Sequence, residues 1–198
     1  MKTLIYTLLL FGFLKSENSP YVVVLGIAQD GGLPHAGCVQ KCCKNSWSTG
    51  ENEKVSSIGI IDPKTGQSWL IDATPDFASQ LNILENVHNT KLSGIFLTHA
   101  HIGHYIGLLQ LGREIMGAKN MPVYALLDGT FYSSNEIPHR DMSEIPHLFI
   151  IETMDLLNDM NSKNRKKIYF IHFNHSNPAI NHTSSTSNII RSKRFNLA

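Results

Sequence analysis

The sequence predicts a mixed α/β domain, of the α/β or α+β class, in which strands and helices pack in layers. Its 198 residues include 42% hydrophobic side chains, which suits one domain with a sizeable core. Short apolar runs rich in β-branched residues alternate with stretches whose apolar residues recur at helical spacing, which is the pattern of a layered α/β protein. The formal net charge is +1, so nucleic acid is not an expected partner.

Residues 1–17 are interpreted as a signal peptide. Lys2 precedes an apolar run from Leu4 to Leu14, and polar residues follow up to Pro20. The run is short for a membrane span and typical of a secretory signal, with a buried first strand or helix as the alternative. We therefore expect an exported protein, periplasmic or secreted, with no stable membrane span after signal removal.

The domain itself, which we place at residues 18–180, begins with strand signals. The β-branched run Tyr21–Ile27 predicts a buried strand. Ser57–Ile61 and Ser68–Ile71 flank a turn-forming segment that contains Asp-Pro and Gly, so they predict a hairpin. Gly94–Leu97 is another short apolar run and predicts a further strand.

Helical spacing follows two of these runs. Asp76–Leu84 comes directly after Pro75, which suits a first helical turn, and predicts one helix. Tyr105–Met116 carries apolar residues three and four apart and predicts another. By contrast, Ala28–Gly50 shows no periodicity and predicts a long loop, a kind of segment that often carries function.

The second half of the chain gives weaker signals. Met121–Leu127 and Ile168–Phe173 predict strands, and Leu148–Ile151 could add one more. Met154–Met160 predicts an amphipathic helix. Residues 181–198 are polar and lack periodicity, so we expect an unstructured tail.

Three of the 10 histidines fall in the segment THAHIGH, residues 98–104, directly after a predicted strand. In an extended exit loop, side chains two residues apart point the same way, so His99 and His101 can approach one ion, and His104 can reach it from the next helix. Imidazole ligands suit zinc and iron, and an open set of three is typical of a catalytic site. The spacing therefore predicts a metal centre.

At this point the chain resembles the metallo-β-lactamase superfamily, whose signature at this junction is H-x-H-x-D-H. Within it, the likeness is strongest to the pyrroloquinoline quinone (PQQ) biosynthesis protein B family and its exported relatives. The resembling segments cover most of residues 21–178 and are VVVLGIAQDGGLPHAGC, WLIDATPDF, THAHIGHYIGLLQLGREIMG and IYFIHFNHSNP. The resemblance implies an αββα sandwich of two sheets, with the metal site on loops at one edge.

The resemblance also implies roles for individual residues. His99 and His101 would be ligands of a first metal and His104 of a second. His175 would be the third histidine of the first metal, with His172 as the alternative. Asp72 would orient a ligand histidine through a hydrogen bond rather than bind metal itself.

Two departures from the family pattern affect these expectations. Gly103 stands where the signature has Asp, so the second site lacks its carboxylate, and we expect one metal, or one tight and one weak. Relatives also continue beyond residue 178 with further strands, so the chain looks C-terminally shortened. Unpaired strand edges and an exposed core face would follow.

The three cysteines, Cys38, Cys42 and Cys43, form a second cluster. Thiolates prefer zinc, and the spacing suits a closed structural site, for which His35 is one option as fourth ligand. A disulfide with one free thiol, or plain buried thiols, are the alternatives. The family resemblance also implies a Cys-rich loop here that holds a structural zinc.

Two functions fit this sequence. The first is a metal-dependent hydrolase that uses His-bound zinc to activate water, or oxygen if the site holds iron as in oxidation of a tyrosine-derived PQQ precursor. Its substrate would be a small molecule or peptide-derived compound. The second is a catalytically weak metal- or ligand-binding module, such as a carrier of a quinone precursor, which the shortened C-terminus and Gly103 favour.

Overall fold

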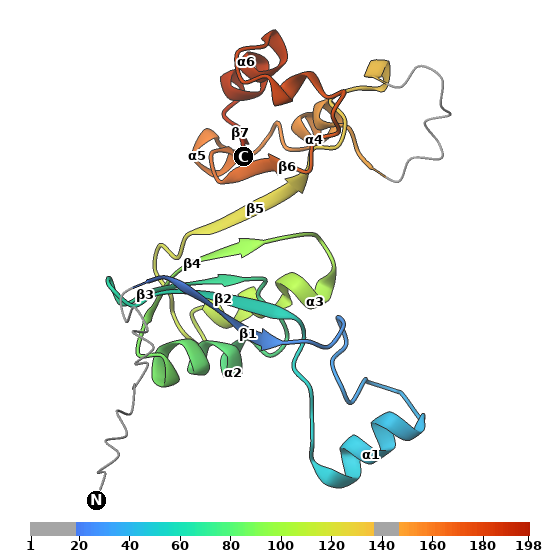
Figure 1. Ribbon diagram of the computed structural model, residues 1–198, viewed down its shortest axis with the longest axis vertical. Helices are drawn as coiled ribbons and strands as arrows, with labels where there is room; N and C mark the ends of the chain where they lie inside the picture. The colour runs from blue at the N-terminus through green and yellow to red at the C-terminus, as the bar shows by residue number, and fades with distance from the viewer. Residues whose placement is uncertain (1–18, 137–146) are drawn as a thin grey trace, which may run out of the picture.

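The computed structural model describes residues 19–136 and 147–198. The predicted signal peptide, residues 1–17, lies outside these ranges. All seven strands belong to one sheet and follow one another across it in chain order (Figure 1). The strands are β1 (Tyr21–Gly26), β2 (Ser57–Asp62), β3 (Gln67–Ile71), β4 (Lys91–Leu97), β5 (Val123–Asp128), β6 (Ile168–Ile171) and β7 (Asn196–Leu197).

Helices of several kinds connect these strands. The α-helices are α1 (Lys41–Thr49), α2 (Phe77–Asn82), α3 (Ile102–Tyr105), α4 (Ile150–Leu156), α5 (Ser162–Arg165) and α6 (Ser185–Ser192). A π-helical turn, η1 (Ile83–Val87), continues α2, and 3₁₀ turns form η2 (Ile106–Leu111), η3 (Ser134–Glu136) and η5 (Pro178–Ile180). The α/β class predicted from the sequence is confirmed.

The direction of the strands determines where a site can form. β1, β2 and β3 are antiparallel neighbours, and the predicted hairpin of β2 and β3 is confirmed, with Ile58 opposite Ile71. From β4 to β7 each strand runs parallel to the one before it. The carboxyl ends of β3, β4, β5 and β6 therefore meet at one edge, which is where ligands bind in open α/β sheets.

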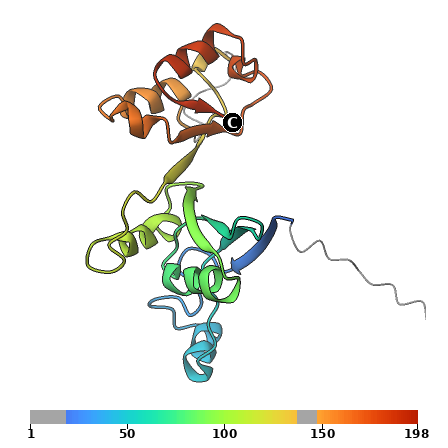
Figure 2. The ribbon, with the colours of Figure 1, turned by 90° about the vertical axis from the view of Figure 1, so that its left-hand side faces the viewer.

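The first hydrophobic core lies between one face of strands β1–β4 and the helices α2 and η1 (Figure 2). Strand β2 shows the expected alternation, with Ser57, Gly59 and Ile61 buried and the residues between them more exposed. The core is formed by Leu25, Ile61, Leu70, Ala73, Phe77, Leu84, Leu92 and Ile95.

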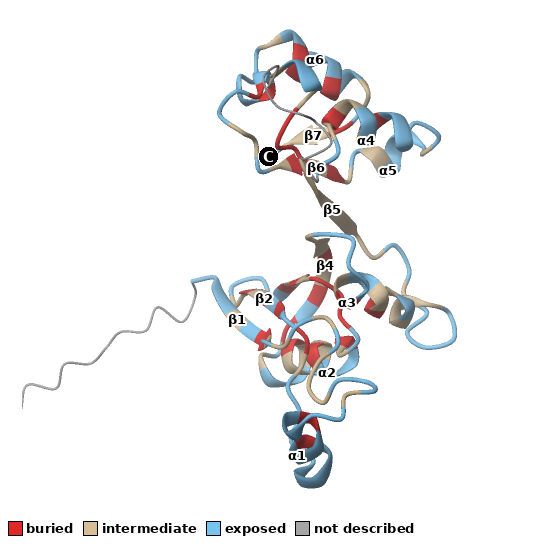
Figure 3. Ribbon diagram, turned by 90° about the vertical axis from the view of Figure 1, so that its right-hand side faces the viewer, coloured by how far each residue is buried: buried red, intermediate tan, exposed pale blue. Residues whose placement is uncertain are grey.

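The opposite face of β1 and β2 is open. Val22, Val24 and Ile58 are 62%, 65% and 37% exposed, and the burial colouring shows this side of β1 in the pale blue of exposed residues (Figure 3). The expected exposed core face is thus present. The αββα arrangement contains two sheets, whereas the described residues form one.

A second core holds the C-terminal part together, above β5 in Figure 1. Its buried members are Ile150, Met154, Ile168, Phe170, Ala179, Ile190 and Phe195. Two of them come from residues 181–198, so the prediction of an unstructured tail was wrong. Ser184 caps α6 by accepting a hydrogen bond from the Ser187 N–H, and β7 then pairs with β6. The helix was not predicted because α6 has only about two turns and buries only one side, so its sequence shows no long apolar pattern.

Three local predictions need correction. The predicted loop Ala28–Gly50 contains α1, a helix with only Cys43 and Ser46 buried and hence no apolar periodicity to detect. The predicted helix Tyr105–Met116 is instead α3 followed by η2, because the Gly107 N–H donates to Ala73 O and fastens the chain to the end of β3. Leu148–Ile151 is not a strand, since α4 begins at Ile150. Across the ranges that the structure describes, no helix has the length and apolar character to cross a membrane.

The second core provides a test of the structured tail. Ile190 and Ile189 are neighbours on α6, yet Ile190 is fully buried and Ile189 is 43% exposed. We expect Ile190→Ala to lower the free energy of unfolding by about 2–5 kcal/mol, because it leaves a cavity in the core. Ile189→Ala should change it by about 0.5 kcal/mol or less. Urea denaturation of both variants measures the difference, and equal effects would mean that α6 is not packed as described.

Candidate metal centre

Asp72 anchors the candidate site at the carboxyl end of β3. Its backbone has φ 67°, a left-handed conformation that Asp tolerates better than most residues, and the residue is 5% exposed. Its carboxylate accepts hydrogen bonds from the backbone N–H and the hydroxyl of Thr98, at 2.8 and 2.7 Å. Since Thr98 follows β4 directly, these bonds join the ends of two neighbouring parallel strands and fix the start of the histidine segment.

The same hydroxyl fixes the orientation of His99. Thr98 Oγ1 lies 2.9 Å from His99 Nδ1. Because the single hydroxyl proton is donated to Asp72, Thr98 can only accept from His99, so His99 carries its proton on Nδ1. In the neutral ring its Nε2 then carries the lone pair, which lies within hydrogen-bond distance of His101 Nδ1, at 3.1 Å. Asp72 is thus linked to His99 through Thr98, and its role in orienting a metal ligand stays a prediction.

His104 lies between two carboxylates. Its Nδ1 is 2.8 Å from Asp72 Oδ2, and its Nε2 is 2.9 Å from Oδ1 of Asp30, a residue of the loop that follows β1. The other oxygen of Asp30 lies 3.4 Å from His101 Nδ1. The three histidines of the segment therefore meet, and they share a carboxylate that the sequence reasoning did not place in the site.

The donor atoms suit a metal ion such as zinc. With zinc–nitrogen bonds of about 2.0–2.1 Å, two ligand atoms of a tetrahedral site lie about 3.3 Å apart. The separations His99–His101 and His101–Asp30 are 3.1 and 3.4 Å. The set forms a series of close pairs rather than one compact cluster, since no three of these donors lie within 4.8 Å of one another. Three of them could bind one ion only after side-chain rotation.

A mostly apolar pocket adjoins His99. It has a volume of about 240 Å³ and lies between the histidine segment and β5. Tyr105 and His99 line it almost entirely through carbon atoms, and the other lining residues are Leu97, Ala100, Leu108, Ala125 and Leu127. A small apolar or aromatic group bound there would lie against the candidate metal ligands.

His175 and His172 are not brought to this site in the parts of the chain described. His175 is exposed on the loop after β6 and makes no hydrogen bond or ion pair there, so its role as third ligand stays a prediction. His172 instead joins a separate group, in which its Nδ1 lies 3.0 Å from Thr130 Oγ1 and 3.2 Å from Asp128 Oδ1.

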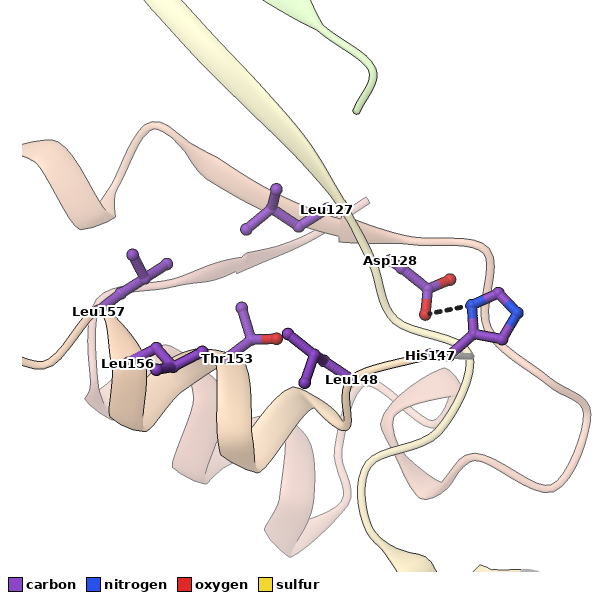
Figure 4. Close-up of a pocket in the computed structure, with 7 residues that line it drawn as sticks. All are labelled: Leu127, Asp128, His147, Leu148, Thr153, Leu156 and Leu157. Atoms are coloured by element: carbon purple, nitrogen blue, oxygen red, sulfur yellow. Dashed lines mark ion pairs between the residues drawn. The ribbon is translucent and has the colours of Figure 1, made fainter. Parts of the chain in front are cut away.

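Asp128 also contacts a histidine that the sequence reasoning passed over. His147 Nδ1 lies 3.2 Å from Asp128 Oδ2, at an angle unsuited to a hydrogen bond, so the contact is an ion pair only when His147 is protonated (Figure 4). The two residues border an open pocket of about 390 Å³, which is otherwise lined by four leucines and Thr153. This pocket lies in the second half of the chain and is distinct from the one beside His99.

The three thiols also converge. The Sγ atoms of Cys38, Cys42 and Cys43 lie within 4.8 Å of one another, and among the described residues this is the one group of three or more His, Cys, Asp or Glu donors that meets that spacing. A shared hydrogen bond from the Cys43 thiol lowers the pKa of Cys38, and the same bond raises the pKa of Cys43. The cluster could therefore hold a metal through thiolates.

The fourth ligand of that cluster does not come from the His35 ring. The imidazole packs against Gly31, where an added Cβ would lie 2.1 Å from two ring atoms. Only the backbone N–H of His35 approaches the cluster, at 3.4 Å from Cys43 Sγ.

The thiol cluster can be tested by alkylation. If Cys38, Cys42 and Cys43 hold zinc, coordination should protect them from iodoacetamide until a chelator removes the ion. Cys42→Ser should release this zinc, lower the melting temperature and expose the loop from Ala28 to Gly50 to proteolysis, because metal binding here stabilises the fold. Mass spectrometry that shows one disulfide and one free thiol in native protein would contradict the zinc assignment.

The hydroxyl of Thr98 can be tested by two conservative changes. Thr98→Val should weaken metal binding at the histidines by about 10- to 100-fold, since His99 loses the group that orients it. Thr98→Ser keeps the hydroxyl and should bind metal as the parent does. Competition with a chromogenic chelator measures both affinities, and equal loss in the two variants would point to packing of the methyl group instead.

Comparison with known proteins agrees with the histidine motif. Residues 52–126, which include β2 to β4 and most of β5, match the family model described as the metallo-beta-lactamase superfamily. Coenzyme PQQ synthesis protein B of Methylorubrum populi is 30% identical over 101 residues, which cover 46% of this chain and 33% of that protein. The Klebsiella pneumoniae protein of the same name is 33% identical over 101 residues, covering 46% and 32%. The chain thus matches about a third of the length of these relatives.

Solved structures were compared as well. Zn(2+)-bound PqqB from Methylobacterium extorquens aligns with 89% of this chain and 96% of its own, at 17% identity and a TM-score of 0.42. A diphosphatase of the PhnP family aligns with 91% of this chain and 95% of its own, at 17% identity and a TM-score of 0.40. The sequence comparisons thus show that residues 52–126 are similar to the metallo-beta-lactamase superfamily, and that about half of the chain is similar to coenzyme PQQ synthesis protein B.

Proposed function

We propose that this protein is a metal-dependent enzyme of the hydrolase type, with its metal held by His99, His101 and His104. The observation that carries the proposal is the fixed series Asp72–Thr98–His99, which leaves His99 Nε2 unprotonated and 3.1 Å from His101 Nδ1. A hydrogen-bonded support anchored on a buried carboxylate, here Asp72, is typical of metal-binding histidines. Bound zinc would supply activated water there, and bound iron would supply oxygen chemistry.

The chain's own residues would orient the substrate. The apolar pocket beside His99, lined in part by the Tyr105 ring, would accept a small apolar or aromatic group. His101 is exposed, with 69% of its side chain accessible, so a substrate can reach the site from solvent. The similarity to PQQ synthesis protein B supports a substrate from quinone or quinone-precursor chemistry, with simple esters and lactams as general hydrolase substrates.

A binding function remains the second candidate. It is favoured by the placement of His175, which is exposed on the loop after β6 and is not brought to the histidine segment. A site without this ligand would bind metal and a small molecule and turn over slowly. Such a protein would still be stabilised by its metal, because an ion that binds only the native state raises the apparent stability.

Removal of two histidines tests the proposal. We expect His99→Ala combined with His101→Ala to lose the metal of this site and all metal-dependent turnover, while zinc at the cysteines is retained. His88→Ala is the control, because His88 bonds to Tyr21 at 3.0 Å and has no contact with the site. Elemental analysis gives the metal content, and protein reloaded with zinc or ferrous iron is assayed with esters, lactams and oxidisable tyrosine derivatives.

Two results would contradict the enzyme proposal. Unchanged metal content in the double histidine variant would mean that the metal is bound elsewhere. Metal-dependent stabilisation of the parent without turnover of any of these substrates would favour the binding function instead.

A further inference from the structure

We propose that Asp30 is a metal ligand and supplies the carboxylate that the H-x-H-x-D-H signature places at position 103, where this chain has glycine. The inference rests on the proposed histidine site and adds a residue to it from a distant part of the sequence. Neither the family signature nor spacing along the chain points to Asp30, because 73 residues separate it from Gly103 and only the fold brings the two together.

The loop that carries Asp30 is held to the sheet. The Ala28 N–H donates to Lys54 O, and the Ser56 N–H donates to Ala28 O, so the chain after β1 stays paired with the segment before β2. Asp30 and Gly31 then form a turn closed by a 2.7 Å bond from the Gly32 N–H to Gln29 O. The carboxylate of Asp30 is thereby presented to the histidine segment by a hydrogen-bonded backbone.

Asp30 contacts two of the three histidines, one with each oxygen. Its Oδ1 lies 2.9 Å from His104 Nε2, and its Oδ2 lies 3.4 Å from His101 Nδ1. These are separations that two ligands of one zinc ion can adopt. A carboxylate so placed can bind one ion with a single oxygen or bridge two ions, one beside His101 and one beside His104.

His104 lies between the carboxylates of two aspartates. Its Nδ1 faces Asp72 Oδ2 at 2.8 Å, and its Nε2 faces Asp30 Oδ1 at 2.9 Å. Imidazole nitrogens and carboxylate oxygens are both common ligands of zinc and iron. The groups that meet around His104 are therefore of the kinds that bind a metal cation.

Gly103 and Asp30 are two parts of one arrangement. A Cβ at position 103 would lie 2.5 Å from Asp30 Cα, 2.7 Å from its Cβ and 2.8 Å from its carbonyl oxygen. Since two of these atoms are backbone, a side chain at 103 would require the loop to move. With the loop in this position, the chain has room for the carboxylate of Asp30 and none for a side chain at position 103.

The test measures metal affinity rather than activity. Asp30→Asn keeps the size and hydrogen-bonding capacity of the side chain and removes its charge, so we expect zinc affinity at the histidine site to fall at least about tenfold, as for other metal-site groups. Asp159→Asn makes the same substitution at an exposed residue in the second half of the chain and should bind as the parent does. Zinc titration of metal-free full-length protein against a chromogenic chelator gives each affinity, and thermal melting with chelator present confirms that each variant folds.

A swap of the two residues provides the second measurement. Asp30→Gly should lose the affinity as Asp30→Asn does. Adding Gly103→Asp should not restore it, because the Cα and carbonyl oxygen of residue 30, which a Cβ at 103 would overlap, remain in place. A double variant that binds zinc as tightly as the parent would contradict the claim that position 103 has no room for the carboxylate.

The outcomes separate this inference from the proposed function. If Asp30→Asn titrates like the parent while the His99→Ala, His101→Ala variant loses metal, Asp30 is not a ligand and the histidine site stands. If the parent binds no more zinc than the double histidine variant, no metal is held at the histidines, and both proposals are overturned.

Discussion

The buried carboxylate of Asp72 is the constraint on which the rest of the site depends. A carboxylate that is 5% exposed must find donors within the protein, since an unpaired buried charge is strongly destabilising. It finds them in the backbone and hydroxyl of Thr98 and in the ring of His104. The hydrogen bonds that the Asp72 carboxylate needs therefore fix three features together. These are the path of the chain after β4, the tautomer of His99 and the position of His104.

The rest of the fold places the histidine segment and Asp72 near the boundary between the two hydrophobic cores. One core lies under strands β1–β4 and a second packs around β6, with β5 between them (Figure 1). Every residue of β5 is half-buried, and Leu127 borders both the pocket beside His99 and the larger one beside Asp128. A ligand beside His99 would therefore contact residues of the first core and of the strand that leads to the second.

Much of the fold and part of the site could be predicted from the sequence. Strands β1 to β6 and the THAHIGH motif were found because their patterns are local, with short apolar runs in one case and close histidine spacing in the other. The two-residue strand β7 was missed because it is too short to show a pattern. The helices α1 and α6 were missed because each buries only one narrow side, so neither leaves an apolar period in the sequence. Asp30 was missed for a different reason. It lies in the predicted loop Ala28–Gly50, but the glycine at position 103 gave no indication of which distant residue would lie beside it.

The close approach of Gly103 to Asp30 also limits how the sequence can change. An added Cβ at 103 would overlap the backbone of Asp30, so a signature carboxylate cannot be gained while the present loop stays in place. Nor can Asp30 be lost without removing the charge that faces His101 and His104. A carboxylate at position 30 and a carboxylate at position 103 therefore exclude each other. A change from one to the other in evolution requires either an intermediate sequence without the carboxylate or a different conformation of the loop that carries Asp30. This coupling of two residues far apart in the chain would be read in related sequences as covariation, with Asp at one position wherever glycine stands at the other.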